Sequence, residues 1–207
     1  ERGLSAQRHI QKARLVEQLL TLSRLESGAA PTLATVDLDA VVRQVVAELA
    51  PQALAKRQTI AVTPAEACSV EADALLLSVL VRNLVDNAIR YSPADAKVTI
   101  TISSAAGDVR LSVDDSGPGM TEGDRSRLGE RFFRVLGSGQ TGSGLGWSIA
   151  QRIAHAHGAT MSVARSSALG GLSVGLKFLF GRAWQRQHIG PLADRVVPEV
   201  GFGAEAQ

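Results

Sequence analysis

Three short polar segments in a fixed order constrain the fold of this chain more than any other feature. They read Asn-Leu-Val-Asp-Asn at 83–87, Asp-Ser-Gly-Pro-Gly at 115–119 and Gly-Ser-Gly-Leu-Gly at 142–146. The first carries two amides one helical turn apart, the second a carboxylate beside a tight turn, and the third a glycine-rich turn that opens a helix. Such groups can bind a hard metal ion, a base amine and phosphate, respectively. A fold that brings the three segments together would form a nucleotide site.

Composition fits a globular chain and excludes several classes of partner. The chain has 207 residues, of which 45% are hydrophobic, enough for one core with an appended helix. Because 22 Lys and Arg nearly balance 20 Asp and Glu, we expect no nucleic-acid partner. Cys68 is the only cysteine, and no Cys/His spacing suggests zinc, which favours a reducing compartment. The sequence has no apolar run of about 18 residues and no signal peptide, so we expect no direct membrane contact here.

Hydrophobic periodicity predicts an alternation of helices and strands. A helix with a wide apolar face is expected at 4–27, followed by a linker at 28–31. Strands are expected at 35–38, 59–63, 69–71, 98–103, 109–113, 160–164 and 172–180, and further helices after caps at Asp39 and Asp73 and at 145–157. The Asp39 helix contains Pro51, and the Asp73 helix ends at Ser92-Pro93. This order predicts an α+β fold with helices on one face of a largely antiparallel sheet.

The first polar segment lies on the helix that Asp73 opens. Asn83 and Asn87 are four residues apart, so their amides share one helix face, and Arg90 and Tyr91 lie one turn further along. Amide oxygens suit Mg²⁺, a guanidinium can neutralise phosphate, and a tyrosine can stack on a base. The alternative is that both asparagines simply face solvent.

The second and third segments also have two interpretations each. Asp115 follows an apolar strand and can accept a hydrogen bond from an exocyclic amine, although an ordinary turn would also explain 115–119. The glycines at 142–146 leave backbone N–H groups free for phosphate at a helix N-terminus, yet they form neither a Walker A nor a Rossmann fingerprint. Residues 135–143 are expected to form a mobile lid or, alternatively, a surface loop. His155 and His157, near a helix end, are expected to be structural.

Four segments together resemble one known family. Residues 82–93, 114–120, 130–134 and 141–149 are similar, in order and wording, to the N, G1, F and G2 boxes of bacterial sensor histidine kinases. Residues 14–27 resemble the second helix of that family's dimerisation and phosphotransfer domain, so the resemblance extends over residues 4 to 180. Within the family, 75–93 is most similar to the QseC subgroup.

The resemblance implies the Bergerat fold, an α/β sandwich, with ATP and Mg²⁺ as ligands. By motif, Asn87 would bind Mg²⁺ with help from Asn83, Asp115 would hold the adenine amino group, and Tyr91 would line the base pocket. Asn83 and Arg134 are the residues assigned to the catalytic step. The other cofactor-binding positions by motif are Arg90 and Arg134 at the phosphates, Gly117, Gly119 and Met120 in the G1 box, and Gly142, Ser143, Gly144, Leu145 and Gly146 at the phosphate end.

This sequence departs from the family pattern at two points. Trp147 stands where the family usually has a smaller aliphatic residue, and no His-Glu-Leu-Arg-Thr-Pro phosphoacceptor segment is present. We therefore expect the acceptor histidine, and any sensor or membrane segment, upstream of Glu1.

The expected organisation is a bundle helix with linker at 1–30, an ATP-binding domain at 31–181 and a tail at 182–207. The expected function is the kinase core of a two-component sensor, the cytoplasmic portion of a bacterial inner-membrane protein that forms a homodimer through the bundle helix. Its expected partners are ATP or ADP and a response regulator. A related ATPase or anti-sigma serine kinase is disfavoured by the apolar helix at 15–25, and a non-enzymatic nucleotide-binding adaptor stays open.

Overall fold

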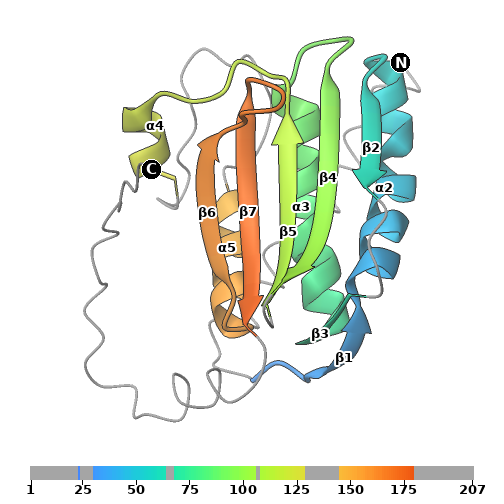
Figure 1. The fold of residues 1–207 in the computed structure, drawn as a ribbon, viewed down its shortest axis with the longest axis vertical. Helices are drawn as coiled ribbons and strands as arrows, with labels where there is room; N and C mark the ends of the chain where they lie inside the picture. The colour runs from blue at the N-terminus through green and yellow to red at the C-terminus, as the bar shows by residue number, and fades with distance from the viewer. Residues whose placement is uncertain (1–22, 24–29, 64–67, 106–107, 129–144, 180–207) are drawn as a thin grey trace.

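A five-stranded sheet covered by helices on one face forms the body of the molecule. The computed structural model describes residue 23 and residues 30–63, 68–105, 108–128 and 145–179. The elements are β1 (Ala34–Asp37), α2 (Leu38–Ala55), β2 (Thr59–Thr63), β3 (Ser69–Ala72), α3 (Ala74–Tyr91), β4 (Lys97–Ala105), β5 (Asp108–Asp115), α4 (Glu122–Ser126), α5 (Gly146–Ala156), β6 (Thr160–Arg165) and β7 (Leu172–Leu179). Figure 1 shows α2, α3 and α5 behind the sheet.

The sheet has the order β2-β4-β5-β7-β6. All of its pairs are antiparallel except β2 with β4, which run parallel. The predicted hairpin is confirmed as β4 and β5, and the predicted last two strands are confirmed as β6 and β7. A parallel pair needs a crossover connection, which α3 supplies between β2 and β4. The expected α+β architecture is therefore confirmed.

The first and third strands lie outside this sheet. β1 and β3 pair antiparallel with each other as a separate two-stranded sheet, with Ala34 opposite Ala72. This small sheet lies at one end of the molecule, where α2 and α3 both begin (Figure 1). It fixes the common starting point of the two helices.

The core lies between the helices and the large sheet. α3 packs between α2 and α5 and buries nine residues, among them Leu77, Leu80 and Leu84. The sheet contributes alternate residues such as Ile100 and Leu111. Because one stripe of each helix and one face of the sheet are buried together, the far end of α3 is held in a fixed place relative to β5.

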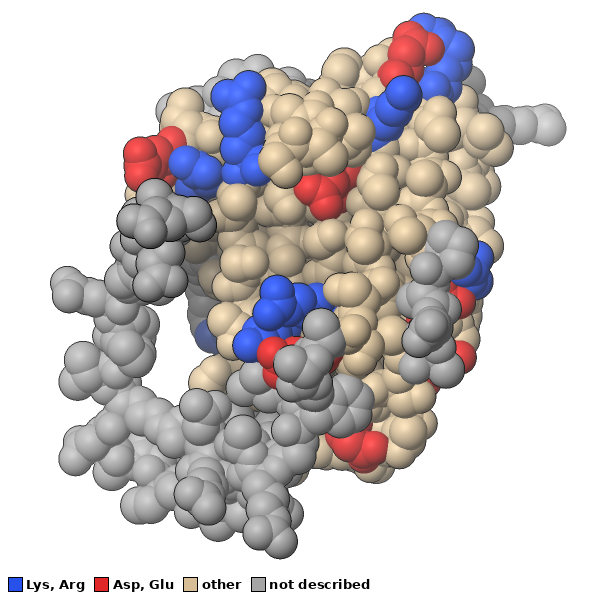
Figure 2. Space-filling model, viewed as in Figure 1, with Lys and Arg blue, Asp and Glu red and all other residues tan. Residues whose placement is uncertain are grey.

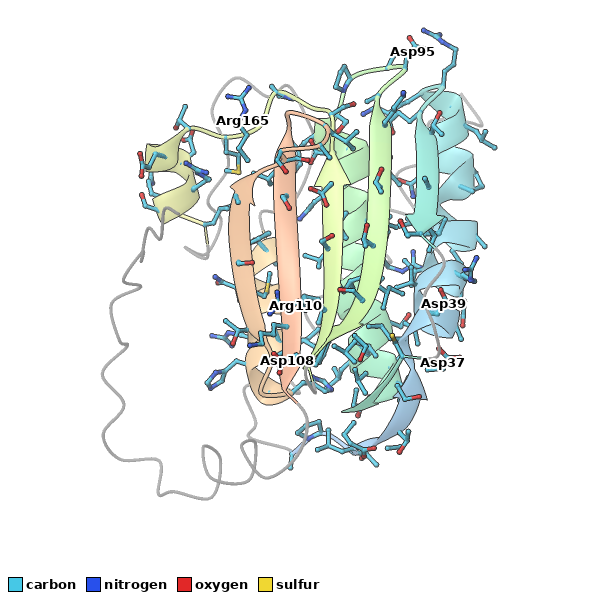
Figure 3. The ribbon with its side chains drawn as sticks, in the orientation of Figure 1. Asp37, Asp39, Asp95, Asp108, Arg110 and Arg165 are labelled. Carbon is cyan, nitrogen blue, oxygen red and sulfur yellow. The ribbon has the colours of Figure 1, made fainter. Side chains whose placement is uncertain are left out.

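The start of α2 corrects one prediction. Asp37, not Asp39, is the N-cap, since its Oδ1 accepts hydrogen bonds from the backbone N–H groups of Asp39 (3.0 Å) and Ala40 (3.2 Å). Asp39 lies inside the first turn and pairs with Arg43 at 2.6 Å. Either aspartate could cap by residue type, and the end of β1 at Asp37 decides which one is extended. Figure 3 labels both at the start of α2. The helix continues through Pro51 to Ala55.

Two further observations concern the surface. Figure 2 views the side of the sheet that the helices leave uncovered, where basic and acidic side chains of the described residues lie in small separate groups. Within the described part of the chain, no helix is long and apolar enough to cross a bilayer. The expected helix at 4–27, apart from residue 23, lies outside the described residues, as does the tail at 182–207.

Candidate nucleotide-binding site

Asp115, the last residue of β5, is held rigidly at the end of its strand. Its side chain is buried, and Oδ1 accepts hydrogen bonds from the backbone N–H groups of Gly117 (2.8 Å) and Leu172 (3.2 Å). The next residue ties the turn to β4, because Ser116 exchanges hydrogen bonds with the backbone of Lys97 at 2.8 and 2.9 Å. An ordinary turn would not explain why this carboxylate is buried and accepts a hydrogen bond from Leu172, the first residue of a strand that lies far away in the sequence. Asp115 is therefore positioned with its oxygens at a fixed place.

Glycines on two sides make this placement possible. A Cβ added to Gly171 would lie 2.3 Å from both the carbonyl oxygen and Oδ1 of Asp115, and one added to Gly117 would lie 2.9 Å from Oδ1. The Gly171 N–H also donates to the Asp115 carbonyl at 3.1 Å. Gly119 is needed for another reason, since its φ of +72° favours glycine. Gly171 was not among the predicted site residues, although the Gly-Gly pair at 170–171, just before a predicted strand, was the available signal.

An open cavity of about 530 Å³ lies beside this carboxylate. A volume of this order suits a small-molecule site. Its lining comes from the end of α3 and from the turn after β5, namely Tyr91, Ser92, Pro93, Ser116, Gly117 and Pro118. Tyr91 is 39% exposed, as expected of a side chain that offers a ring face to a ligand. In Figure 1 the end of α3, the end of β5 and the start of β7 lie at the same end of the molecule.

Ser92 adds a polar group that the sequence analysis did not select. Ser92 is 1% exposed and lines the cavity. Its hydroxyl oxygen is buried and has no hydrogen-bond partner within the geometric limits. The hydroxyl nevertheless lies close enough to Asp115 to favour the charged form of that carboxylate. A buried hydroxyl without a partner costs free energy unless a ligand or water completes it. The cavity wall therefore includes a buried hydroxyl next to the Asp115 carboxylate.

Burial raises the pKa of Asp115 above its ordinary value, and the nearby Asp114 raises it further. The N–H groups of Gly117 and Leu172, with the Ser92 hydroxyl, oppose this rise without cancelling it. The folded protein therefore binds this proton more tightly than the unfolded chain does.

The stability of an Asp115→Asn variant relative to the wild type is expected to rise with pH. Below pH 3.8, the ordinary pKa of an aspartate, the carboxyl group is protonated in both the folded and the unfolded wild type and costs no stability. As the pH rises through the raised pKa of the folded protein, the wild type loses stability because the buried carboxylate becomes charged. The asparagine does not titrate. Urea unfolding of both proteins between about pH 3 and pH 7 measures the difference. A stability difference between the two proteins that is constant over this pH range would contradict the raised pKa of Asp115.

The two asparagines of α3 have different surroundings. Asn83 is 4% exposed, and its Nδ2 donates to the carbonyl of Val79 at 2.9 Å. Asn87, one turn later, is half-buried. The alternative that both asparagines face solvent is therefore wrong for Asn83. A buried amide on a helix otherwise packed with leucine and valine requires such a polar partner.

The basic residue on the same face has a partner within the helix. Arg90 donates to the buried carboxylate of Asp86 at 2.7 Å, four residues earlier. This pair orients the guanidinium one turn beyond Asn87. Its expected contact with phosphate stays a prediction.

The helix α5 begins without a side-chain cap. Leu145 occupies the N-cap position, is buried in the core, and accepts a hydrogen bond from Ile149 N at 3.0 Å. An uncapped helix start is suited to binding an anion through its backbone. Gly146 could therefore contribute a backbone contact, whereas the Leu145 side chain is buried in the core. Trp147, the departure from the family pattern, packs against the core.

His157 has a structural role, as predicted. It is buried at the end of α5, where Nδ1 contacts the carbonyl of Ile153 at 2.8 Å and Nε2 accepts from the backbone N–H of Asp73 at 3.0 Å. Asp73 in turn caps α3 through Leu75 and Leu76, which confirms that predicted cap. The histidine thus connects the end of α5 to the start of α3.

Several predicted site positions cannot be compared with the structure. Met120 is half-buried after the G1 turn and is not among the residues that line the cavity. The remaining positions, and the expected lid, lie outside the described residues, namely Arg134, Gly142, Ser143, Gly144 and 135–143.

Comparison with known proteins agrees with this geometry. Residues 72–182 match the family described as histidine kinase-, DNA gyrase B- and HSP90-like ATPases. Sensor protein QseC of Escherichia coli (strain K12) is 44% identical over 147 residues, which cover 70% of this chain and 32% of that protein. The chain therefore spans about a third of the length of the curated relatives it matches.

Solved structures show the same fold. The mycobacterial sensor histidine kinase MprB superposes with a TM-score of 0.64 at 25% identity, covering 72% of this chain and 97% of that one. The cytoplasmic segment of histidine kinase QseC gives a TM-score of 0.57 at 29% identity, covering 83% of this chain and 94% of that one.

Since the family match covers more than half of the chain, this protein belongs to the histidine kinase-, DNA gyrase B- and HSP90-like ATPases. Within that family it is an ATP-binding catalytic domain of the sensor histidine kinase type, similar to QseC. The resemblance drawn from the four sequence segments is thus confirmed.

Proposed function

We propose that this chain binds Mg-ATP and, in the whole protein, transfers the γ-phosphoryl group to a histidine outside these residues. The phosphoryl group then passes to an aspartate of a response regulator. The observation that carries the proposal is the buried Asp115 carboxylate, fixed by two backbone N–H groups beside the cavity that Tyr91 lines. Family membership supports ATP as the ligand.

The base end of the site uses the end of α3 and the turn after β5. Asp115 accepts a hydrogen bond from the exocyclic amine of adenine, and the close approach at Gly171 and Gly117 keeps the carboxylate in place. Tyr91 covers one face of the ring. A base without an exocyclic amine would donate no hydrogen bond to this buried carboxylate, which gives preference for a base that carries an amine.

The phosphate end uses the polar face of α3 and the start of α5. Asn87 offers a half-buried amide oxygen to Mg²⁺, with Asn83 one turn earlier. No cluster of three or more His, Cys, Asp or Glu side chains that could hold a metal occurs among the described residues. This donor set fits Mg²⁺, which keeps several waters and shares phosphate oxygens. When bound, the ion would neutralise charge on the phosphates. Arg90 and the N-terminus of α5 would add positive potential.

In phosphoryl transfer the protein mainly positions groups and stabilises charge, so this domain needs no nucleophile of its own. Arg134 and the glycines at 142–144 would complete the phosphate end. For the whole protein we propose a homodimer in the cytoplasmic portion of a bacterial inner-membrane sensor, with residues 1–30 as bundle helix and linker, 31–181 as the ATP-binding domain and 182–207 as the tail.

Incubation with radiolabelled ATP is expected to label a separately supplied histidine-phosphotransfer domain of the same sensor, and not this chain. The described histidines are expected not to reach near-attack geometry. His157 is buried with both ring nitrogens engaged, and His155 lies in the last turn of α5, at the other end of the helix from the proposed phosphate contacts. Acid-labile, base-stable phosphate on the acceptor domain is the readout, with Asp115→Ala as a control in which weaker nucleotide binding should reduce the label.

Two results would contradict the proposal. Label on His9, His155 or His157 would show that the acceptor lies within this chain. ATP hydrolysis without transfer, or binding without either reaction, would favour a related ATPase or a nucleotide-binding adaptor.

A further inference from the structure

Lys56, the first residue after α2, binds the end of α3 through all of its donors. Its Nζ donates to the carbonyl oxygens of Ile89 (2.8 Å), Arg90 (2.9 Å) and Ser92 (2.8 Å). An ammonium group has three N–H donors, so none is left over. The last carbonyls of a helix have no partner within it, and a positive charge is favourable there. Lys56 therefore caps the C-terminus of α3, although it lies more than 30 residues earlier in the chain.

Gln58 reinforces the same point from within the core. Its residue is 5% exposed, and Nε2 donates to the carbonyl oxygens of Ile89 (3.0 Å), Ser92 (3.0 Å) and Pro93 (2.8 Å). Ser92 is extended with φ −82° and ψ 145°, as expected of the residue before a proline. The five N–H donors of these two side chains, one of them shared between two carbonyls, thus determine the path of the chain from the end of α3 to Pro93.

The backbone that receives these bonds is also one wall of the cavity. Tyr91, Ser92 and Pro93 line it, and Asp115 lies beside Ser92. We propose that Lys56 and Gln58 are positioning residues for the base end of the nucleotide site, which they set by holding 89–93 in place. This inference rests on the function proposed above. It assigns a role to residues that carry no family motif and do not touch the cavity.

The chemistry at this position requires lysine in particular. Burial lowers the pKa of Lys56, and the nearby charge of Arg90 lowers it further. An ammonium group is therefore kept there at some cost, which the three carbonyls offset. Arginine carries a planar fork in place of three tetrahedral donors, so it cannot bind the same three oxygens with equal geometry.

The residue between them provides a matched control. Arg57 forms an exposed two-bond pair with Asp95, at 2.8 and 2.7 Å, that joins the same two loops. Figure 3 labels Asp95 in the loop that follows α3. Neither residue lines the cavity or binds a residue that does. Removing this pair also removes a connection between the two loops, but it leaves the hydrogen bonds to the carbonyls of 89–93 in place.

The test uses the full chain with Lys56→Met, Lys56→Arg and the control Arg57→Met. Tyr91 is the only tyrosine, so incorporation of 3-fluorotyrosine gives a single ¹⁹F NMR resonance from the cavity wall. In Lys56→Met this resonance is expected to shift or broaden in the folded protein without nucleotide, and ADP affinity measured by calorimetry is expected to fall about tenfold. Lys56→Arg should lie between Lys56→Met and the wild type in both the ¹⁹F resonance and the ADP affinity. Arg57→Met should match the wild type in both measurements.

The outcomes separate this inference from the function on which it rests. An unchanged ¹⁹F resonance and unchanged ADP affinity in folded Lys56→Met would overturn the positioning role. Equal losses in Lys56→Met and Arg57→Met would also overturn it, because they would reflect general loosening. If Lys56→Met does not fold, a Lys56→Arg variant that matches the wild type in both measurements would overturn it instead. Failure of the wild type itself to bind ADP would overturn the proposed function, whatever the ¹⁹F spectra show.

Discussion

Replacing Gly171 with alanine is expected to reduce adenine-nucleotide affinity by about a hundredfold or more. The new Cβ would lie 2.3 Å from the carbonyl oxygen and Oδ1 of Asp115 and 2.6 Å from the nitrogen of Gly117. Two of these three contacts are with backbone atoms, and the third is with a side-chain oxygen that accepts two hydrogen bonds, so nothing nearby can yield cheaply. The carboxylate must move, which would break the hydrogen bond proposed between it and the base amine. Calorimetry with ADP, with and without Mg²⁺, measures the loss.

Two neighbouring glycines serve as controls for Gly171→Ala. A Cβ on Gly170 meets nothing within 4 Å, so Gly170→Ala should cost only the strain of its φ of +82°, about 1–2 kcal/mol of stability, and leave affinity unchanged. A Cβ on Gly175 meets only the Ser162 hydroxyl, which can rotate away. Wild-type affinity in folded Gly171→Ala would remove the argument that close backbone approach fixes Asp115.

The parts of the site that could be predicted from sequence are those encoded locally. Asp115 ends an alternating strand and is followed at once by a glycine-rich turn, so its place at a strand end follows from its neighbours. Asn83 and Asn87 share a helix face because of their spacing, and Asp73 caps that helix as predicted. These inferences need only residues within one or two turns of one another.

The parts that could not be predicted depend on contacts between distant residues. Leu172 donates to Asp115 from 57 positions away, and Gln58 binds Ile89 from 31 positions away. Nothing in the local pattern around Lys56 indicates that its ammonium group reaches another helix. The parallel pairing of β2 with β4 has the same cause, since register between separate strands is set by packing.

The short helix α4 was not predicted either, although its signal is local. The helix α4 has five residues and buries none of them, so it has no apolar periodicity to detect. Its only sequence signal is Thr121, whose hydroxyl accepts from the backbone N–H of Asp124 at 3.1 Å. Such a helix is specified by its cap and the preceding turn, and hydrophobic pattern gives no information about it.

Replacing Asn87 with alanine is expected to remove the dependence of nucleotide affinity on Mg²⁺. The variant loses the oxygen proposed above as a ligand, and the described residues offer no carboxylate cluster to replace it. Affinity in the presence of Mg²⁺ should fall about 10- to 100-fold, toward the value measured with a chelator. Titration of ATP at several Mg²⁺ concentrations separates this result from a general loss of binding. Asn87 is preferable to Asn83 for the experiment, because Asn83 is buried and bound to Val79, so its removal also costs stability.

Two comparisons make the Asn87 result specific to the metal. Asn87→Asp keeps an oxygen at the same position and should retain Mg²⁺ dependence, whereas Asp115→Ala should weaken binding equally with and without the ion. Opposite patterns in Asn87→Ala and Asp115→Ala would therefore distinguish the phosphate end of the site from its base end. Unchanged Mg-ATP affinity in Asn87→Ala would remove the metal assignment. The base end would still stand in that case, because its evidence is the hydrogen bonding and close packing around Asp115.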